Sequence, residues 1–92
     1  MYIFTKYIMI THNTKTHRFE IEYPEGTAYL EYEDKDGVVT VLHTIVPDAL
    51  SGQGIAARLA KAFYDWVSEN HYPMKSDCSY MTAWLKRNKI KI

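Results

Sequence analysis

The sequence predicts an α+β domain with a mixed, mostly antiparallel sheet and two main helices. Two stretches of alternating apolar and polar residues are joined by turn residues and followed by a β-branched run, a pattern typical of strands. After residue 51 the apolar residues recur at helical spacing, and a short strand pattern separates two such stretches. Because a strand that follows a helix usually pairs parallel to the strand before it, we expect one parallel step in the sheet.

Three strands are expected in the first half of the chain. The first two alternate apolar and polar side chains over residues 17–23 and 27–33. Turn residues follow each of them, Pro-Glu-Gly at 24–26 and Asp-Lys-Asp-Gly at 34–37. Residues 38–46 are apolar or β-branched at almost every position, which predicts a central strand that is covered on both faces.

Two helices and two short strands complete the expected fold. One further strand is expected near residues 7–11 and another over 74–77. The first helix ends near Asn70, and the second covers residues 79–88 with Ser79 as its N-cap. The apolar stripe of the first helix consists of Ile55, Leu59, Ala62, Phe63, Trp66 and Val67. One side of the second carries Tyr80, Ala83, Trp84 and Arg87, and both tryptophans are assigned to the core.

Composition and charge narrow the class of protein. The length of 92 residues suits one domain over residues 1–92, and the formal net charge of zero argues against a general nucleic-acid-binding protein. There is one cysteine, so no internal disulfide can form, and no apolar run reaches the roughly 18 residues of a transmembrane helix. His12, His17 and His71 lack metal-ligand spacing, so no metal is expected. We therefore expect a cytoplasmic protein with no nucleic-acid or membrane partner.

A loop with two glycines joins the β-branched run to the first helix. Residues 51–56 read Ser-Gly-Gln-Gly-Ile-Ala. Glycines let the backbone approach a bulky anion, and a helix N-terminus offers unpaired N–H groups and the positive end of the dipole. These features are typical of an anion site, although a tight strand-to-helix turn has the same glycines. No Lys-Ser/Thr follows, as a Walker loop requires, and the antiparallel strands before the loop differ from the context of a Rossmann fingerprint.

Three segments together resemble the GNAT acetyltransferase superfamily, and more narrowly its small YjdJ-type branch: residues 43–47 (His-Thr-Ile-Val-Pro), 50–59 (Leu-Ser-Gly-Gln-Gly-Ile-Ala-Ala-Arg-Leu) and 78–80 (Cys-Ser-Tyr). The resemblance covers residues 17–88. The loop pattern of the superfamily is Gln/Arg-x-x-Gly-x-Gly/Ala. Gly54 and Ala56 match its last two fixed positions, and Ser51 stands where Gln or Arg is usual.

The resemblance implies that acetyl-CoA is the cosubstrate and that an unidentified amine, on a small molecule or a protein, accepts the acetyl group. The backbone at the end of the β-branched strand should bond the pantetheine arm, and the loop amides should hold the pyrophosphate. The second helix should lie near the thioester. From their charge alone, Lys86 or Arg87 could reach a CoA phosphate. The expected cofactor-binding residues are Ile45, Val46, Ser51, Gly52, Gln53, Gly54, Ile55, Ala56, Ser79 and Arg87.

Three side chains are candidates for the chemistry. Cys78 lies at the expected N-terminus of the second helix, where the thiolate is favoured and could accept an acetyl group; it could equally be a small buried residue. His43 is expected to face the same way as Val39, Val41 and Ile45, either as a core residue or as a general base for an amine or for Cys78. Tyr80 could protonate the leaving CoA thiolate, or simply pack as an aromatic residue on its helix.

Three functions stay open at this point. The leading hypothesis is an acetyl-CoA-dependent N-acetyltransferase that passes the acetyl group to an amine directly or through Cys78. The alternative is a non-catalytic module that binds CoA or acetyl-CoA, because so short a chain leaves little length for an acceptor cleft. A third hypothesis is a thiol enzyme that uses Cys78 and His43 without CoA.

Overall fold

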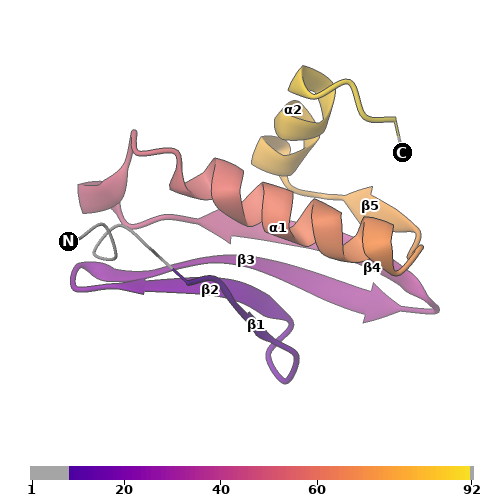
Figure 1. Cartoon of the computed structure of the whole chain (residues 1–92), viewed down its shortest axis with the longest axis horizontal. Coiled ribbons are helices and arrows are strands. Elements are labelled where there is room, and N and C mark those ends of the chain that lie inside the picture. The colour runs from indigo at the N-terminus through magenta and orange to yellow at the C-terminus, as the bar shows by residue number, and fades with distance from the viewer. Residues whose placement is uncertain (1–8, 92) are drawn as a thin grey trace.

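The computed structural model describes residues 9–91, which form a five-stranded sheet with a long helix and a shorter one (Figure 1). The strands lie in the order β1-β2-β3-β4-β5, and all neighbours pair antiparallel except β4 and β5, which are parallel. The predicted α+β fold with one parallel step is therefore confirmed. The elements are β1 (Thr11–Asn13), β2 (Arg18–Tyr23), β3 (Gly26–Lys35), β4 (Val38–Ile45), a short 3-10 helix (Asp48–Leu50), α1 (Ile55–Glu69), β5 (Met74–Ser76) and α2 (Ser79–Arg87).

Two hairpins build most of the sheet. Pro24 and Glu25 join β2 to β3, and Asp36 and Gly37 join β3 to β4. The φ angles of 55° at Asp36 and 81° at Gly37 are the left-handed values that a tight two-residue hairpin turn favours. Both predicted turns are confirmed, and the second is shorter than expected because β3 continues through Lys35.

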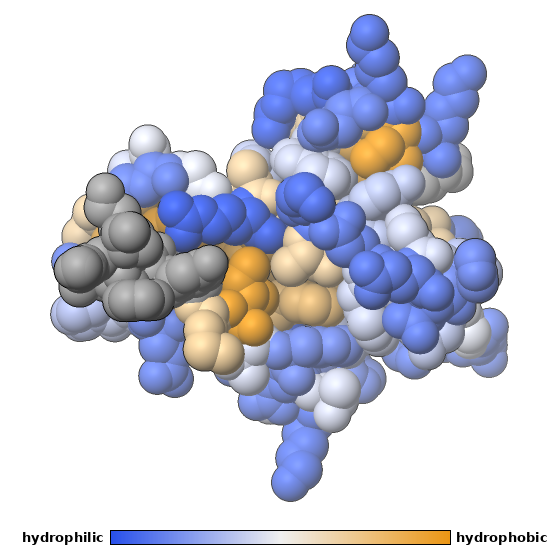
Figure 2. Space-filling view, viewed as in Figure 1, coloured by the Kyte–Doolittle hydropathy of each residue, from blue (hydrophilic) through white to orange (hydrophobic). Residues whose placement is uncertain are grey.

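One face of the sheet, called the core face below, packs against α1. The buried hydrophobic residues of β2, β3 and β4 lie on this face: Phe19, Ile21, Ala28, Leu30, Tyr32, Val39 and Val41. The opposite face, called the open face, carries half-buried or exposed side chains: Arg18, Glu20, Glu22, Tyr29, Glu31, His43 and Ile45. Seen from the side of α1, most of the surface is hydrophilic, with hydrophobic surface limited to small areas (Figure 2).

α1 follows the predicted helix closely. Four residues of the predicted stripe are buried, namely Ile55, Leu59, Phe63 and Val67, and Ala60 joins them. Ala62 and Trp66 are half-buried instead, because they lie at the border of the buried side. Asn70 is the C-cap, as predicted.

β4 is not the central strand that the apolar run predicted. It lies next to the edge strand β5, and β3 occupies the middle of the sheet. Ile45, on the open face, is 44% exposed, so the strand is not covered on both faces. The apolar run reflects β-branched residues that suit a pleated, paired strand rather than burial on two sides. The strand expected near residues 7–11 begins at Thr11, and residues 7 and 8 lie outside the described residues.

A β-bulge divides β4 into two halves that face differently. Tyr32 of β3 pairs with Val41, but the preceding Glu31 pairs with His43, so Leu42 is the extra residue. Because side chains alternate along a strand, one extra residue turns everything after it to the other face. The prediction that His43 faces the same way as Val41 is therefore wrong: His43 lies on the open face.

α2 begins at Ser79 and ends at Arg87, close to the predicted 79–88, but its N-cap is Cys78 rather than Ser79. The Cys78 Sγ accepts a hydrogen bond from the Met81 N–H at 3.4 Å, and Ser79 is the first helical residue, with an exposed side chain. Sulfur is a weak acceptor, so a serine in the next position was the more probable cap from sequence. The buried residues of α2 are Met81, Trp84 and Leu85, so Trp84 alone of the four expected on one side is in the core.

Candidate functional site

The glycine loop forms part of a cavity of about 290 Å³ at the N-terminal end of α1. The end of β4, the loop, the first turn of α1 and the start of α2 contribute its lining: Val46, Leu50, Ser51, Gly52, Gly54, Ile55, Ala56, Ala57 and Tyr80. Most of the expected cofactor-binding residues thus meet at one place. The other expected residues are exposed and are not part of this lining: Ile45, Gln53, Ser79 and Arg87.

The first turn of α1 has unused hydrogen-bond donors. Arg58 is the first residue whose N–H donates along the helix, to the Gly54 carbonyl at 3.2 Å, and no side chain caps this end. The N–H groups of Ile55, Ala56 and Ala57 therefore have no partner in the described part of the chain. The first turn also has no acidic side chain, so the positive end of the helix dipole is not neutralised there.

The backbone of the loop depends on its two glycines. Gly52 and Gly54 have φ angles of 80° and 76°, which are strained for residues with a side chain. A Cβ atom added to either glycine would meet no atom within 4 Å. The glycines are therefore needed for conformation rather than for space inside the protein, and their backbone stays open to a ligand.

The edge of β4 that faces β5 is paired over only part of its length. The parallel pairing covers Val39, Thr40 and Val41, and the Val41 carbonyl accepts the Asp77 N–H at 2.8 Å. The chain then turns into α2. From residue 42 onward this edge has no strand partner among residues 9–91, which leaves backbone groups near Ile45 available for a bound chain.

Tyr80 is the one ionisable side chain in the described lining of the cavity. It is half-buried, and the Arg87 Nη2 donates a hydrogen bond to its Oη at 3.4 Å. The guanidinium carbon of Arg87 lies 5.6 Å from the centroid of the Tyr80 ring. Arg87 is therefore held beside the cavity through Tyr80, while the exposed Lys86 side chain has no ion pair within residues 9–91.

Cys78 lies on the core face and is only 6% exposed. Its Sγ caps α2 and lies 3.6 Å from the Thr44 Oγ1, within hydrogen-bond range for sulfur. Thr44 pairs with the buried Leu30 and therefore lies on the core face. Because of the bulge, Thr44 and not His43 is the residue of β4 beside Cys78. The thiol is a buried structural group in this arrangement.

His43 lies on the other side of the sheet from Cys78. Its side chain is 48% exposed, and its Nε2 is 3.4 Å from the Glu31 Oε1. The structure therefore does not bring His43 and Cys78 together. Sequence reasoning missed Glu31 and Thr44 as neighbours of the two candidates, because the contacts depend on the register of β3 and β4, which no local pattern records.

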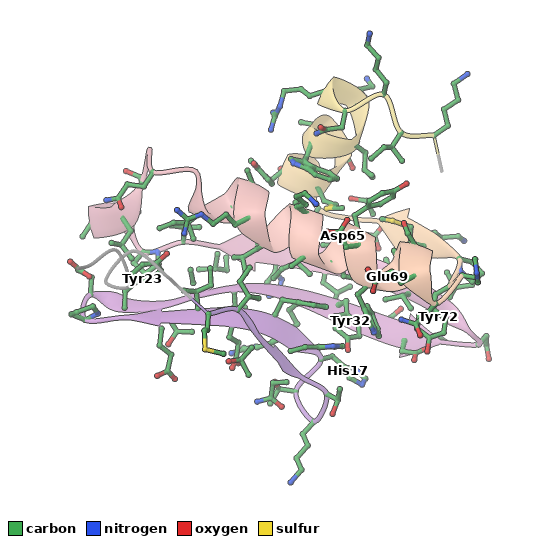
Figure 3. All side chains as sticks on the ribbon, viewed as in Figure 1. His17, Tyr23, Tyr32, Asp65, Glu69 and Tyr72 are labelled. Atoms are coloured by element: carbon green, nitrogen blue, oxygen red, sulfur yellow. The ribbon has the colours of Figure 1, made fainter. Side chains whose placement is uncertain are left out.

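An aromatic cluster at the other end of the sheet was also missed. His12 donates to or accepts from the Tyr32 Oη at 2.6 Å and stacks on Phe19, with ring centroids 4.1 Å apart. His17, Tyr32 and Tyr72 lie near one another beneath the C-terminal half of α1, away from the glycine loop (Figure 3). Alternating aromatic positions in β2 and β3 were the available signal, but they do not show which strands meet.

Burial in this cluster changes two protonation equilibria. Burial, and secondarily the nearby His17, lowers the pKa of His12 from 6.5. Burial raises the pKa of Tyr32 above 10.0, with smaller contributions from Asp34 and Tyr72. Both groups are therefore favoured in their neutral forms.

The described residues contain neither a metal-binding cluster nor a membrane-spanning helix. Within residues 9–91 no group of three or more His, Cys, Asp or Glu side chains is arranged to hold a metal ion. None of the described helices is both long and apolar enough to cross a membrane.

Several known proteins are similar in sequence to this chain over most of its length. Residues 18–91 match the family model described as GCN5-related N-acetyl-transferase. The chain is 33% identical over 87 residues to Protein NATD1 of Gallus gallus, and the aligned region covers 90% of this chain and 78% of that protein. Protein NATD1 of Xenopus tropicalis is 33% identical and that of Homo sapiens 32%, with 79% and 76% of those proteins covered. The chain belongs to the GCN5-related N-acetyltransferase family.

Proposed function

We propose that this protein binds acetyl-CoA at the glycine loop and transfers the acetyl group to an amine. The observation that carries the proposal is the cavity at the N-terminal end of α1, where a chain of this family presents unpaired backbone donors and no acidic residue. The pyrophosphate would accept hydrogen bonds from the N–H groups of residues 52–57 and be stabilised by the helix dipole. Ser51 also lines the cavity, and its hydroxyl would add a further donor.

The pantetheine arm would run from the loop along the unpaired edge of β4. Val46 connects the two, because it ends this edge and lines the cavity. A pantetheine amide would form hydrogen bonds with the backbone at the end of β4, as β5 does with Val39 to Val41 earlier in the same strand. This course would take the thioester toward the bulge, where His43 of β4 lies on the open face and Cys78 lies on the side of the core face.

Exposure of the two candidates favours direct transfer over a covalent intermediate. In the direct route the amine nitrogen attacks the thioester carbonyl carbon, a C–N bond forms and the C–S bond breaks. His43, on the open face, accepts the proton that the amine loses, and Tyr80 donates a proton to the CoA thiolate. The covalent route through Cys78 needs a thiol that is only 6% exposed to leave its cap position and reach the thioester.

The binding step is tested by thermal unfolding with CoA, using Ala56→Asp. An aspartate in the first turn of α1 places a negative charge against the pyrophosphate, so the stabilisation by CoA should disappear. The same aspartate suits the helix dipole, so without CoA the variant should be as stable as the wild type or more stable by about 0.3–1 kcal/mol. Ala83→Asp, on an exposed position of α2, is the control and should keep the wild-type response to CoA. Full stabilisation of Ala56→Asp by CoA would reject the proposed pyrophosphate site.

A non-catalytic CoA-binding module is the second candidate function. It is favoured by the cavity lining, in which Tyr80 is the one ionisable side chain among the described residues. A panel of small amines, polyamines and lysine-containing peptides separates the two functions, with release of free CoA as the readout. Binding of acetyl-CoA without release of CoA above the rate of hydrolysis for any amine would favour the module.

A further inference from the structure

Four side chains of the open face form a closed ring of contacts: Arg18, Tyr29, Glu31 and His43. The Glu31 Oε1 lies 3.1 Å from the Arg18 Nε and 3.4 Å from the His43 Nε2. The Arg18 guanidinium carbon lies 3.9 Å from the centroid of the Tyr29 ring. Tyr29 meets His43 edge-on, with ring centroids 6.0 Å apart. Each member therefore touches two others.

The sheet register places this ring of contacts. Arg18 of β2 is directly opposite Glu31 of β3, and Glu31 is directly opposite His43 of β4. Directly opposed residues have Cβ atoms about 5 Å apart, so their side chains meet on one face. His43 joins the row because the bulge at residue 42 has turned it to the open face.

We propose that Glu31 is a positioning residue that holds His43 as the general base of the acetyl transfer, an inference that rests on the proposed function. The Glu31 Oε1 lies 3.4 Å from the His43 Nε2, and the negative charge of the carboxylate favours the tautomer that carries its proton on Nε2 and leaves Nδ1 free. Nδ1 takes the proton that the attacking amine loses. The resulting imidazolium lies beside the Glu31 carboxylate, which stays ionised throughout.

Arg18 fixes the carboxylate in turn. Its Nε donates to the same Oε1, and its guanidinium lies over Tyr29, which limits how far Glu31 can move. The ring of contacts is too exposed to contribute much stability: the side chains of Arg18, Glu31 and His43 are 34%, 28% and 48% exposed. Exposed ion pairs contribute at most about 1 kcal/mol, so a purely structural role predicts a small effect on stability and none on turnover.

A double-mutant cycle on kcat tests the proposal. In the wild-type background Glu31→Gln should lower kcat about tenfold, as loss of an orienting partner does elsewhere, while KM for acetyl-CoA stays unchanged. In the His43→Gln background the same substitution should have no further effect, because there is no imidazole left to orient. Glu33→Gln is the matched control and should behave as the wild type. Glu33 is an exposed glutamate of β3 opposite Thr40, and it forms no ion pair with any of residues 9–91.

An NMR measurement reads the positioning itself without turnover. Three-bond couplings about the His43 Cα–Cβ bond should report one rotamer in the wild type and in Glu33→Gln, and averaging between rotamers in Glu31→Gln. An unchanged His43 rotamer in Glu31→Gln, or equal losses of kcat from Glu31→Gln in both backgrounds, would overturn the proposal. Wild-type protein that acetylates no amine would instead overturn the proposed function, and the positioning role with it.

Discussion

The two candidate catalytic residues beside the end of β4, Cys78 and His43, lie on opposite faces of the sheet and differ strongly in their surroundings. On the core face, Cys78 is 6% exposed, caps α2 and lies beside Thr44. On the open face, His43 is 48% exposed and stands beside Glu31. The sulfur already caps α2, whereas the His43 Nδ1 has no partner among residues 9–91.

One inserted residue creates this difference. Without the bulge at Leu42, strand alternation would point His43 at the core and Thr44 at solvent. A buried histidine beside a cysteine would suggest a thiol enzyme. The bulge separates the pair and leaves each side chain with its own partner, so the comparison favours direct acetyl transfer over a thiol intermediate.

The largest expected effect is on turnover. His43→Gln should reduce kcat by about 10²–10⁴-fold, the usual contribution of a general base, whereas Cys78→Ser should leave it close to the wild type. Steady-state release of CoA with an amine found in the panel measures both. The substituted histidine is half exposed, so loss of folding is not expected, and circular dichroism checks this. A larger loss for Cys78→Ser than for His43→Gln would reverse the assignment of the two faces.

The next effect is on stability and concerns the cysteine. Cys78→Ala removes the cap of α2 and should lower the free energy of unfolding by about 1–2 kcal/mol. Cys78→Ser keeps an acceptor for the Met81 N–H and should lose less, although its hydroxyl is buried. Urea unfolding of the three proteins measures the difference. Equal stability of Cys78→Ala and wild type would show that the sulfur is not needed as a cap.

The smallest expected effect is the pH dependence of stability from His12, the core-face counterpart of the exposed His43. Because burial lowers the pKa of His12 below 6.5, the unfolded chain binds a proton there more readily than the folded one. Its contribution to stability is therefore complete above pH 6.5 and falls as the pH drops below that value. His12→Gln should unfold with a weaker dependence on pH than the wild type between about pH 7 and pH 5. An identical dependence in both proteins would contradict this.

Much of the fold follows from local patterns. The alternation in residues 17–23 and 27–33, the Asp-Gly turn and the stripe of α1 each depend on neighbours within a few positions, so sequence was enough to predict them. The glycine loop also has a local signature, and its cavity lies at the predicted end of α1.

Features that depend on register could not be predicted in the same way. The bulge is a shift in the pairing of β3 with β4, and the sequence of residues 38–46 alone contains no signal for it. For the same reason the partners of His43 and Cys78 were not found from sequence. The cap of α2 was missed for a different reason: Cys78 and Ser79 are adjacent, and the commoner capping residue is not the one that the chain uses.

The most direct test of the account is a rapid-quench experiment with acetyl-CoA and an accepted amine, in which the mass of the intact protein is followed through one turnover. If the open face carries the chemistry, the acetylated amine forms while Cys78 stays unmodified throughout. An acetyl group that appears on Cys78 before the product, and leaves as the product forms, would contradict the account and place the reaction on the core face.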